Sequence, residues 1–173
     1  PLFFKLLESV PPVEVLAQRI VWSLPLCFVI MMFRRQIGEY IAALKDGRVL
    51  RLLLASSLLI ALNWIVYIYA IFTDHVLAAS LGYYLNPLVN VLLGMVFLGE
   101  RLSRLQAVAV VIAAIGVAIL LAGALDTLWI SLTLALSFGT YGLIRKVVPV
   151  GSLRGLAVET TLLLPLSVVV VGY

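Results

Sequence analysis

The sequence has few charged residues, one cysteine and one histidine. Lys, Arg, Asp and Glu make up 12% of the chain, and 64% of the residues are hydrophobic. Soluble domains carry roughly 25% charged residues, so a soluble fold could not bury this much apolar surface. Cys27 lies in an apolar run, which excludes a disulfide framework and a thiolate metal site. His75 alone cannot form a centre of several histidines, and we expect neither a metal nor a cofactor.

The positive charges gather in alternate connections between long apolar runs. All but Lys5 and Arg19 lie within 34–51, 101–104 and 145–154, and the connections between these carry no Lys or Arg. Positive loops of polytopic membrane proteins stay on the cytoplasmic side. The basic connections are therefore predicted to be cytoplasmic, with Pro11–Pro12, Asp74–His75 and Asp126 on the outer side. This loop bias explains the net charge of +4, and no nucleic-acid partner is expected.

The apolar runs have the length of membrane-spanning helices. A bilayer core about 30 Å thick needs roughly 20 apolar residues per helix. Spans are predicted at Val15–Phe33, Leu52–Phe72, Val76–Leu98, Leu105–Gly123 and Leu128–Ile144, with parts of spans at Pro1–Leu7 and Leu156–Tyr173. The runs are continuous and too long for barrel strands, so we expect an all-α polytopic membrane protein in a lipid bilayer. The last complete span is the most polar, and we expect it inside the bundle.

Two further features concern the ends and the first basic connection. The chain opens at Pro1 without Met and stops at Tyr173, both in apolar runs, so we expect a fragment. Within the first basic connection, Ile37, Tyr40, Ile41 and Leu44 recur at helical spacing. This stripe predicts either a short amphipathic helix in the headgroup region or a solvated loop.

The chain also matches itself weakly at an offset of 140 residues. Leu24-Pro25-Leu26 falls on Leu164-Pro165-Leu166, and Arg19 falls on Glu159. The offset covers five spans, an odd number, so the second copy would enter the membrane from the opposite side. Inverted repeats are typical of secondary transporters. Chance matching of apolar helices is the alternative, and whether Arg19 and Glu159 touch stays open.

Several segments carry a family resemblance. The stretch from Val76 to Ile119 closes one span in Leu98-Gly99-Glu100-Arg101 and continues into a glycine-containing span. It resembles the EamA-type branch of the drug/metabolite transporter superfamily. The segments QRIVWS (18–23), NWIVYIYA (63–70), LGYYLNPLVN (81–90), YGLIRK (141–146) and ETTLLLP (159–165) together resemble the RarD, or chloramphenicol-sensitivity, group of that branch.

The resemblance implies a ten-helix bundle of two inverted five-helix repeats in the bacterial inner membrane. On that template, residues 1–127 are the first repeat, truncated at its N-terminal end. Residues 128–173 are the start of the second repeat, truncated at its C-terminal end. About six to seven of the ten helices would be present.

Polar and aromatic residues of the third span share one helix face. Asn63 and Tyr67 are one turn apart, with Trp64 beside them. A polar stripe inside lipid is costly unless it faces a partner helix or a water-filled cavity. We expect these residues to line a solute cavity, and hydrogen bonding between helices is the alternative.

The fourth span carries Tyr83, Asn86, Pro87 and Asn90 near its middle. Pro87 has no N–H, so the carbonyl of Tyr83 loses its helical partner and the helix bends. A freed carbonyl beside two asparagines suits a binding site on a discontinuous helix. A kink that only shapes packing is the alternative.

Two ionisable residues lie inside predicted spans. Arg19 either lines the cavity and attracts carboxylate groups of a solute, or snorkels outward. Glu159 is a candidate proton-coupling acid, because burial disfavours the charged form of a carboxyl group. Structural pairing is the alternative for Glu159. Tyr141, in the YGLIRK segment, completes the expected substrate-binding set.

These features predict a secondary transporter (a permease) that moves a small organic solute by alternating access, with a proton as possible coupling ion. The chain is not expected to be an enzyme: it has no His-x-x-x-His motif or paired aspartates inside a span. A membrane-embedded enzyme stays an alternative, as does a pore or scaffold subunit, which the repeat disfavours. No Gly-x-x-x-x-Gly-Lys loop is present, which disfavours ATP-driven transport.

Overall fold

The computed structural model describes residues 11–122 and 125–171, and this part of the chain is almost entirely helical. The helices are α2 (Pro12–Phe33), α3 (Ile37–Lys45), α4 (Gly47–Phe72), α5 (Val76–Leu98), α6 (Arg104–Ala122), α7 (Leu128–Val147) and α8 (Ser152–Val171), with a short 3₁₀ turn, η1 (Leu125–Thr127), before α7. The predicted all-α fold class is confirmed. The predicted piece of a span at Pro1–Leu7 lies outside the described residues.

Five helices are long and apolar enough to cross a membrane: α2, α4, α5, α7 and α8. Helix α6 is also apolar but shorter over its described part. The predicted span Val76–Leu98 coincides with α5, and the others agree with their helices except at the ends. Helix α4 starts five residues before the predicted span, at Gly47. The carboxylate of Asp46 caps it by accepting hydrogen bonds from the backbone N–H groups of Arg48 and Val49, at 2.9 and 3.2 Å.

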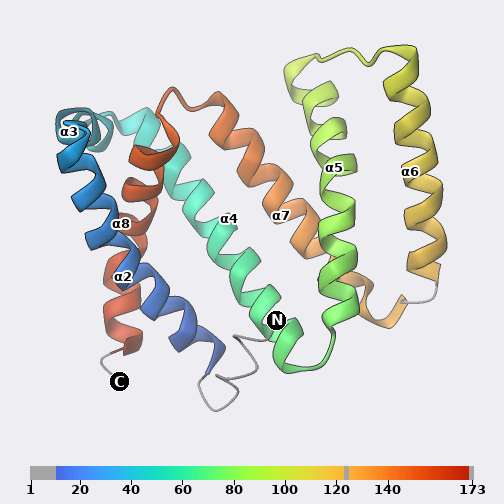
Figure 1. Ribbon diagram of the computed structural model, residues 1–173, viewed down its shortest axis with the longest axis horizontal. Helices are drawn as coiled ribbons and strands as arrows, with labels where there is room; N and C mark the ends of the chain where they lie inside the picture. The colour runs from blue at the N-terminus through green and yellow to red at the C-terminus, as the bar shows by residue number, and fades with distance from the viewer. Residues whose placement is uncertain (1–10, 123–124, 172–173) are drawn as a thin grey trace.

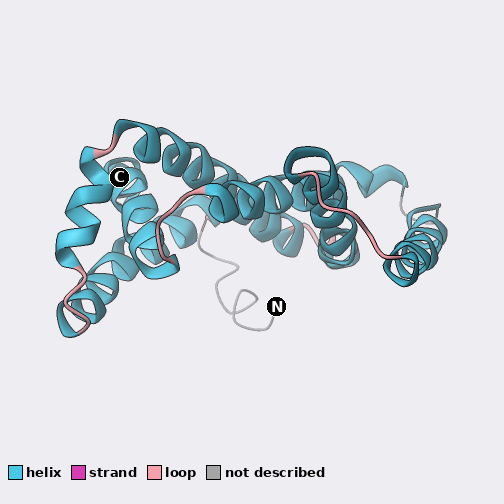
Figure 2. Cartoon of the chain, turned by 90° about the horizontal axis from the view of Figure 1, so that it is seen from above, coloured by secondary structure: helices cyan, strands magenta, loops and turns pink. Residues whose placement is uncertain are grey.

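The long helices alternate in direction along the chain (Figure 1). Helix α3, the α5–α6 turn and the α7–α8 turn consequently lie at one end of the molecule, the top of Figure 1. These segments are the three basic connections, so the charge pattern and the fold agree, and by the positive-inside rule we expect this end to be the cytoplasmic one. Seen from above, the helices form a long, narrow array and not a closed ring (Figure 2).

Helix α3 confirms the helical alternative for the first basic connection. Tyr40 and Ala43 are buried against the bundle, and the Tyr40 hydroxyl lies 2.8 Å from the Thr161 hydroxyl of α8. Ile41 stays exposed. The predicted apolar stripe therefore packs mainly on the neighbouring helices, because α3 lies across the cytoplasmic ends of α4 and α8.

Helix α7 packs between α4 and α5, which confirms the expected interior position of this polar span. Its contact with α5 is very close at Gly82, where an added Cβ would lie 2.8 Å from Leu134 Cβ. Beside it, the Ser131 hydroxyl donates to the Ala78 carbonyl at 2.7 Å. Small residues at such positions let two membrane helices approach closely. Ser131 is thus used in the contact with α5, and both it and Ser137 are buried.

Candidate functional site

A cavity of about 330 Å³ lies between α2, α4, α7 and α8. Its lining combines apolar and aromatic side chains with a few polar ones, including Ile20, Trp64, Phe138, Tyr141, Glu159 and Thr160. This volume falls in the range of sites for small organic molecules. Three of the residues predicted from the sequence, Trp64, Tyr141 and Glu159, are thus brought to one cavity although they come from three helices.

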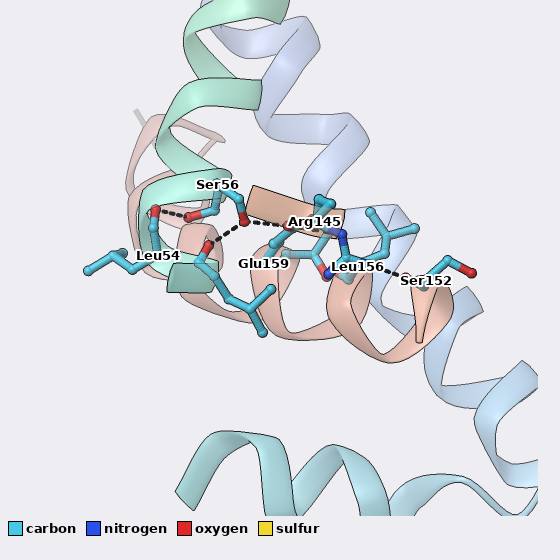
Figure 3. Close-up of polar contacts among 9 residues, drawn as sticks. Leu54, Ser56, Arg145, Ser152, Leu156 and Glu159 are labelled. Carbon is cyan, nitrogen blue, oxygen red and sulfur yellow. Dashed lines mark hydrogen bonds and ion pairs between the residues drawn. The ribbon is translucent and has the colours of Figure 1, made fainter. Parts of the chain in front are cut away.

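Glu159 is the buried charge of this cavity, with 2% of its surface exposed. Its Oε1 atom accepts a hydrogen bond of 2.5 Å from the Ser56 hydroxyl of α4. The same oxygen lies 3.8 Å from Nε of Arg145 at the end of α7, and Figure 3 shows the three side chains converging. Tyr141 also interacts with this carboxyl group. Ser56 and Arg145 were not among the residues predicted from the sequence.

The network around Glu159 leaves two polar atoms unused. Arg145 Nη2 donates to the Ser152 carbonyl at 3.2 Å. In contrast, Arg145 Nη1 and Glu159 Oε2 are buried and have no hydrogen-bond partner among the described residues. Buried polar groups are normally hydrogen-bonded. The pair is therefore incompletely satisfied in this conformation.

Arg19 lies beside the cavity and not on the carboxylate. Its guanidinium is 4.6 Å from the centroid of the Trp64 ring, a cation–π contact, and the residue is exposed. The question that the repeat left open is answered for this conformation: Glu159 forms its ion pair with Arg145, whereas Arg19 stacks on Trp64.

A row of aromatic rings leads from the cavity toward α5. Tyr141 and Phe138 have ring centroids 6.0 Å apart, Phe138 and Tyr83 are 6.4 Å apart, and Tyr83 and Tyr67 are 5.6 Å apart. Rings from α4, α5 and α7 therefore meet at distances typical of aromatic pairs. Two more predicted residues, Tyr67 and Tyr83, join the site in this way. Phe138 was missed because a lone Phe in an apolar span carries no distinguishing signal.

The predicted asparagines lie apart from the Glu159 cavity. The Asn63 amide is buried and donates to the Leu134 carbonyl and the Ser137 hydroxyl, at 2.9 and 3.0 Å, so it links α4 to α7. Asn86 is buried too, and its Oδ1 has no partner among the described residues.

Pro87 and Asn90 are exposed on α5. Asn90 lines a separate cavity of about 230 Å³ near the cytoplasmic ends of α5 and α7, with Gly139, Gly142 and Lys146. The structure thus does not bring the predicted set together: the Glu159 cavity holds one part of it, Asn90 lines another cavity, and Asn63 and Asn86 are buried outside both.

Comparison with known proteins gives consistent matches. Residues 1–122 match the EamA-like transporter family. The chain is 51% identical over 171 residues to an uncharacterized transporter of Pseudomonas aeruginosa, covering 98% of this chain and 57% of that protein. It is 47% identical to the uncharacterized transporter YojE of Bacillus subtilis, over 96% of this chain and 57% of that protein. It is 42% identical to the protein RarD of Escherichia coli, over 98% and 57%.

The chain therefore spans a little over half the length of these curated relatives. No solved structure matches it.

Proposed function

This chain belongs to the EamA-like transporter family and is a multi-pass inner-membrane protein similar to RarD, and from this premise we propose that it forms a solute site of a secondary transporter. The proposed substrate is a small organic solute, moved by alternating access. The observation that carries the proposal is the cavity between α2, α4, α7 and α8, lined by aromatic rings and a buried carboxylate inside the membrane-spanning helices.

The chemistry of this cavity suits binding and release better than covalent reaction. Trp64, Phe138 and Tyr141 offer flat apolar surfaces, which bind organic molecules without bond formation. An ionisable residue inside a membrane bundle is costly and by default marks a substrate or ion pathway. Glu159 is therefore proposed to take up and release the coupling proton.

The repeat division is proposed along with the function. Residues 1–127 would form the first inverted repeat, and residues 128–173 would start the second. Helices α2 and α8, which the 140-residue offset relates, pack side by side and run in opposite directions (Figure 1). A site between repeats is the arrangement that alternating access requires, and the Glu159 cavity lies against both helices.

The test is a flux measurement on the full-length protein in liposomes that contain a pH-sensitive dye. Amino acids, related metabolites and chloramphenicol are added outside, one at a time. We expect at least one solute to move protons, and we expect Glu159→Gln to abolish this movement. Glu100→Gln is the matched control, because Glu100 is an exposed carboxylate at the cytoplasmic turn.

Two tryptophans test the cavity itself. Trp64→Leu removes a ring that lines the cavity, whereas Trp22→Leu removes a ring that is 72% exposed. Solute uptake should fall in the first variant and stay near wild type in the second. If both variants took up solute equally, at equal amounts of protein in the membrane, the cavity would not lie on the transport path. Solute uptake without proton movement would keep the transporter and remove Glu159 from coupling.

A further inference from the structure

The Arg145–Glu159 pair differs in its surroundings from the other ion pairs that the structure describes. Lys146 pairs with Glu100, and Arg154 pairs with Glu39, at the cytoplasmic connections, where at least one side chain of each pair is more than half exposed. The side chains of Arg145 and Glu159 are only 13% and 2% exposed. Surface pairs contribute little, whereas a buried pair must compensate for the loss of water around both charges.

The geometry of the buried pair does not give that compensation in full. A strong Arg–carboxylate pair is bidentate, with N···O distances of about 2.7–2.9 Å. Here a single nitrogen, Arg145 Nε, lies 3.8 Å from Glu159 Oε1, and that oxygen is already held by Ser56. One oxygen of the carboxylate and one nitrogen of the guanidinium have no partner. The pair joins α7 to α8, but its attraction compensates only in part for the burial of the two charges.

The position of Arg145 at the end of a helix allows its side chain to move away from Glu159. It lies in the last turn of α7, where the partial negative charge of the helix end favours a cation. Its long stem can carry the guanidinium toward cytoplasmic water. The guanidinium rests against Gly155, at a place that a Cβ on residue 155 would occupy. Tyr141, one turn deeper on α7, lines the Glu159 cavity, so Arg145 lies on the cytoplasmic side of that cavity.

We propose that the Arg145–Glu159 pair is a cytoplasmic latch of the cavity, which protonation of Glu159 releases. This inference rests on the proposed function, because it takes Glu159 as the group that binds the proton. A proton adds to the unpartnered Oε2, and the pair changes from zero net charge to +1. Arg145 keeps its proton, loses its counter-charge and moves to cytoplasmic water. Arg145 is thus a positioning residue that acts through Glu159.

The surroundings of Glu159 contain few other groups that could replace Arg145. Besides Arg145, the elements packed around α8 carry these ionisable side chains: Tyr141 and Lys146 on α7, Glu14, Arg19 and Cys27 on α2, Glu39, Tyr40 and Lys45 on α3, and Arg48, Arg51, Tyr67 and Tyr69 on α4; Arg154 lies on α8 itself. Of these, Tyr141 interacts with the Glu159 carboxyl group, whereas Arg19 stacks on Trp64 and Tyr40 contacts Thr161. Arg145 is the cation that Glu159 pairs with among the described residues.

The experiment follows access to the cavity through Trp64. Trp22 and Trp129 are changed to Phe in the full-length protein in lipid nanodiscs, along with any tryptophan in its other segments, so that Trp64 alone fluoresces. Acrylamide, which is uncharged, serves as quencher across a pH series. We expect quenching to increase by about two-fold or more on acidification. Glu159→Gln should be quenched strongly at every pH, because a neutral side chain cannot hold the latch.

Arginine variants separate the latch from a packing role. Arg145→Gln should lose the pH dependence, and Arg145→Lys should retain it, because the lysine keeps the charge. Gly155→Ala displaces the guanidinium without removing it and should raise quenching at neutral pH. Gly151→Ala is the matched control, because Gly151 precedes α8 and an added Cβ there would meet the guanidinium of Arg154, which pairs with Glu39 and not with Glu159.

An unchanged pH profile in Arg145→Gln, or in Gly155→Ala if the first variant does not fold, would overturn the latch. A wild-type protein whose quenching is the same at every pH would overturn it as well. The assay needs no transported solute, so its result is independent of the flux measurement. If quenching of Trp64 depended on pH but no solute were transported, this inference would stand and the proposed function would be wrong.

Discussion

The close contact between α5 and α7 makes Gly82→Ala the most informative single substitution for the fold. An added Cβ would lie 2.8 Å from Leu134 Cβ and 3.1 Å from the Ser131 carbonyl oxygen, whereas carbon atoms in contact sit about 3.5–4.0 Å apart. Neither neighbour is the end of a flexible side chain, so the two helices must move apart. Overpacking of this kind costs about 1–3 kcal/mol.

A gain in helix propensity of about 0.5–1 kcal/mol offsets part of that cost, so we expect a net loss of up to about 2.5 kcal/mol. For a chain of this size, 1 kcal/mol corresponds to about 2–4 °C in melting temperature, and the expected decrease is therefore up to about 10 °C. The assay is thermal unfolding of the detergent-solubilised protein. Gly116→Ala on α6 is the control, because no atom lies within 4 Å of its added Cβ. If both variants melted together, the close approach at Gly82 would be refuted.

Four further substitutions test individual contacts. Asn63→Ala should lower the melting temperature, since interhelical hydrogen bonds contribute about 0.6–2 kcal/mol, and should leave the KM for solute unchanged; a raised KM would instead favour direct solute binding. Tyr40→Phe and Thr161→Val should each lower the free energy of unfolding by about 0.5–1.5 kcal/mol. If the double variant lowered it by the sum of the two, the two hydroxyl groups would not share a hydrogen bond. Glu100→Gln removes an exposed ion pair and should change stability by less than about 1 kcal/mol, which a denaturation series can check.

The membrane spans were predictable because their signals are local in sequence. An apolar run has the same length wherever it packs, and α5 accordingly begins and ends at the predicted residues. The start of α4 was missed because it depends on a cap: Asp46 begins the helix, so Arg48 lies in a helical turn and not in the loop where its charge placed it. Helix ends are set by hydrogen bonds of single side chains, which hydropathy does not contain.

The site was only partly predictable for a different reason. A charge inside an apolar run selected Glu159, and the spacing of polar residues along one helix selected Asn63 and Tyr67, with Trp64 beside them. Such spacing does not show how deep one helix lies relative to its neighbour, or how each helix is rotated about its own axis. The sequence therefore could not show that Arg145, whose charge fits a cytoplasmic connection, reaches back to Glu159. The 140-residue offset aligned Arg19 with Glu159 and left open whether the two touch, and the structure places Arg19 on Trp64.

Helix α6 differs from α7 in what holds it in place. Its described side chains are largely exposed, from Leu105 at 82% to Ile119 at 71%, and its main neighbour is α5. Its stability within this chain therefore comes from partition into hydrocarbon, whereas that of α7 comes from association with α4 and α5. An aspartate at the centre of α6 would cost about 2.5–3.5 kcal/mol when the translocon releases the helix into lipid. The same residue in α7 would carry this insertion cost too, and would in addition disturb the packing of α7 against α4 and α5.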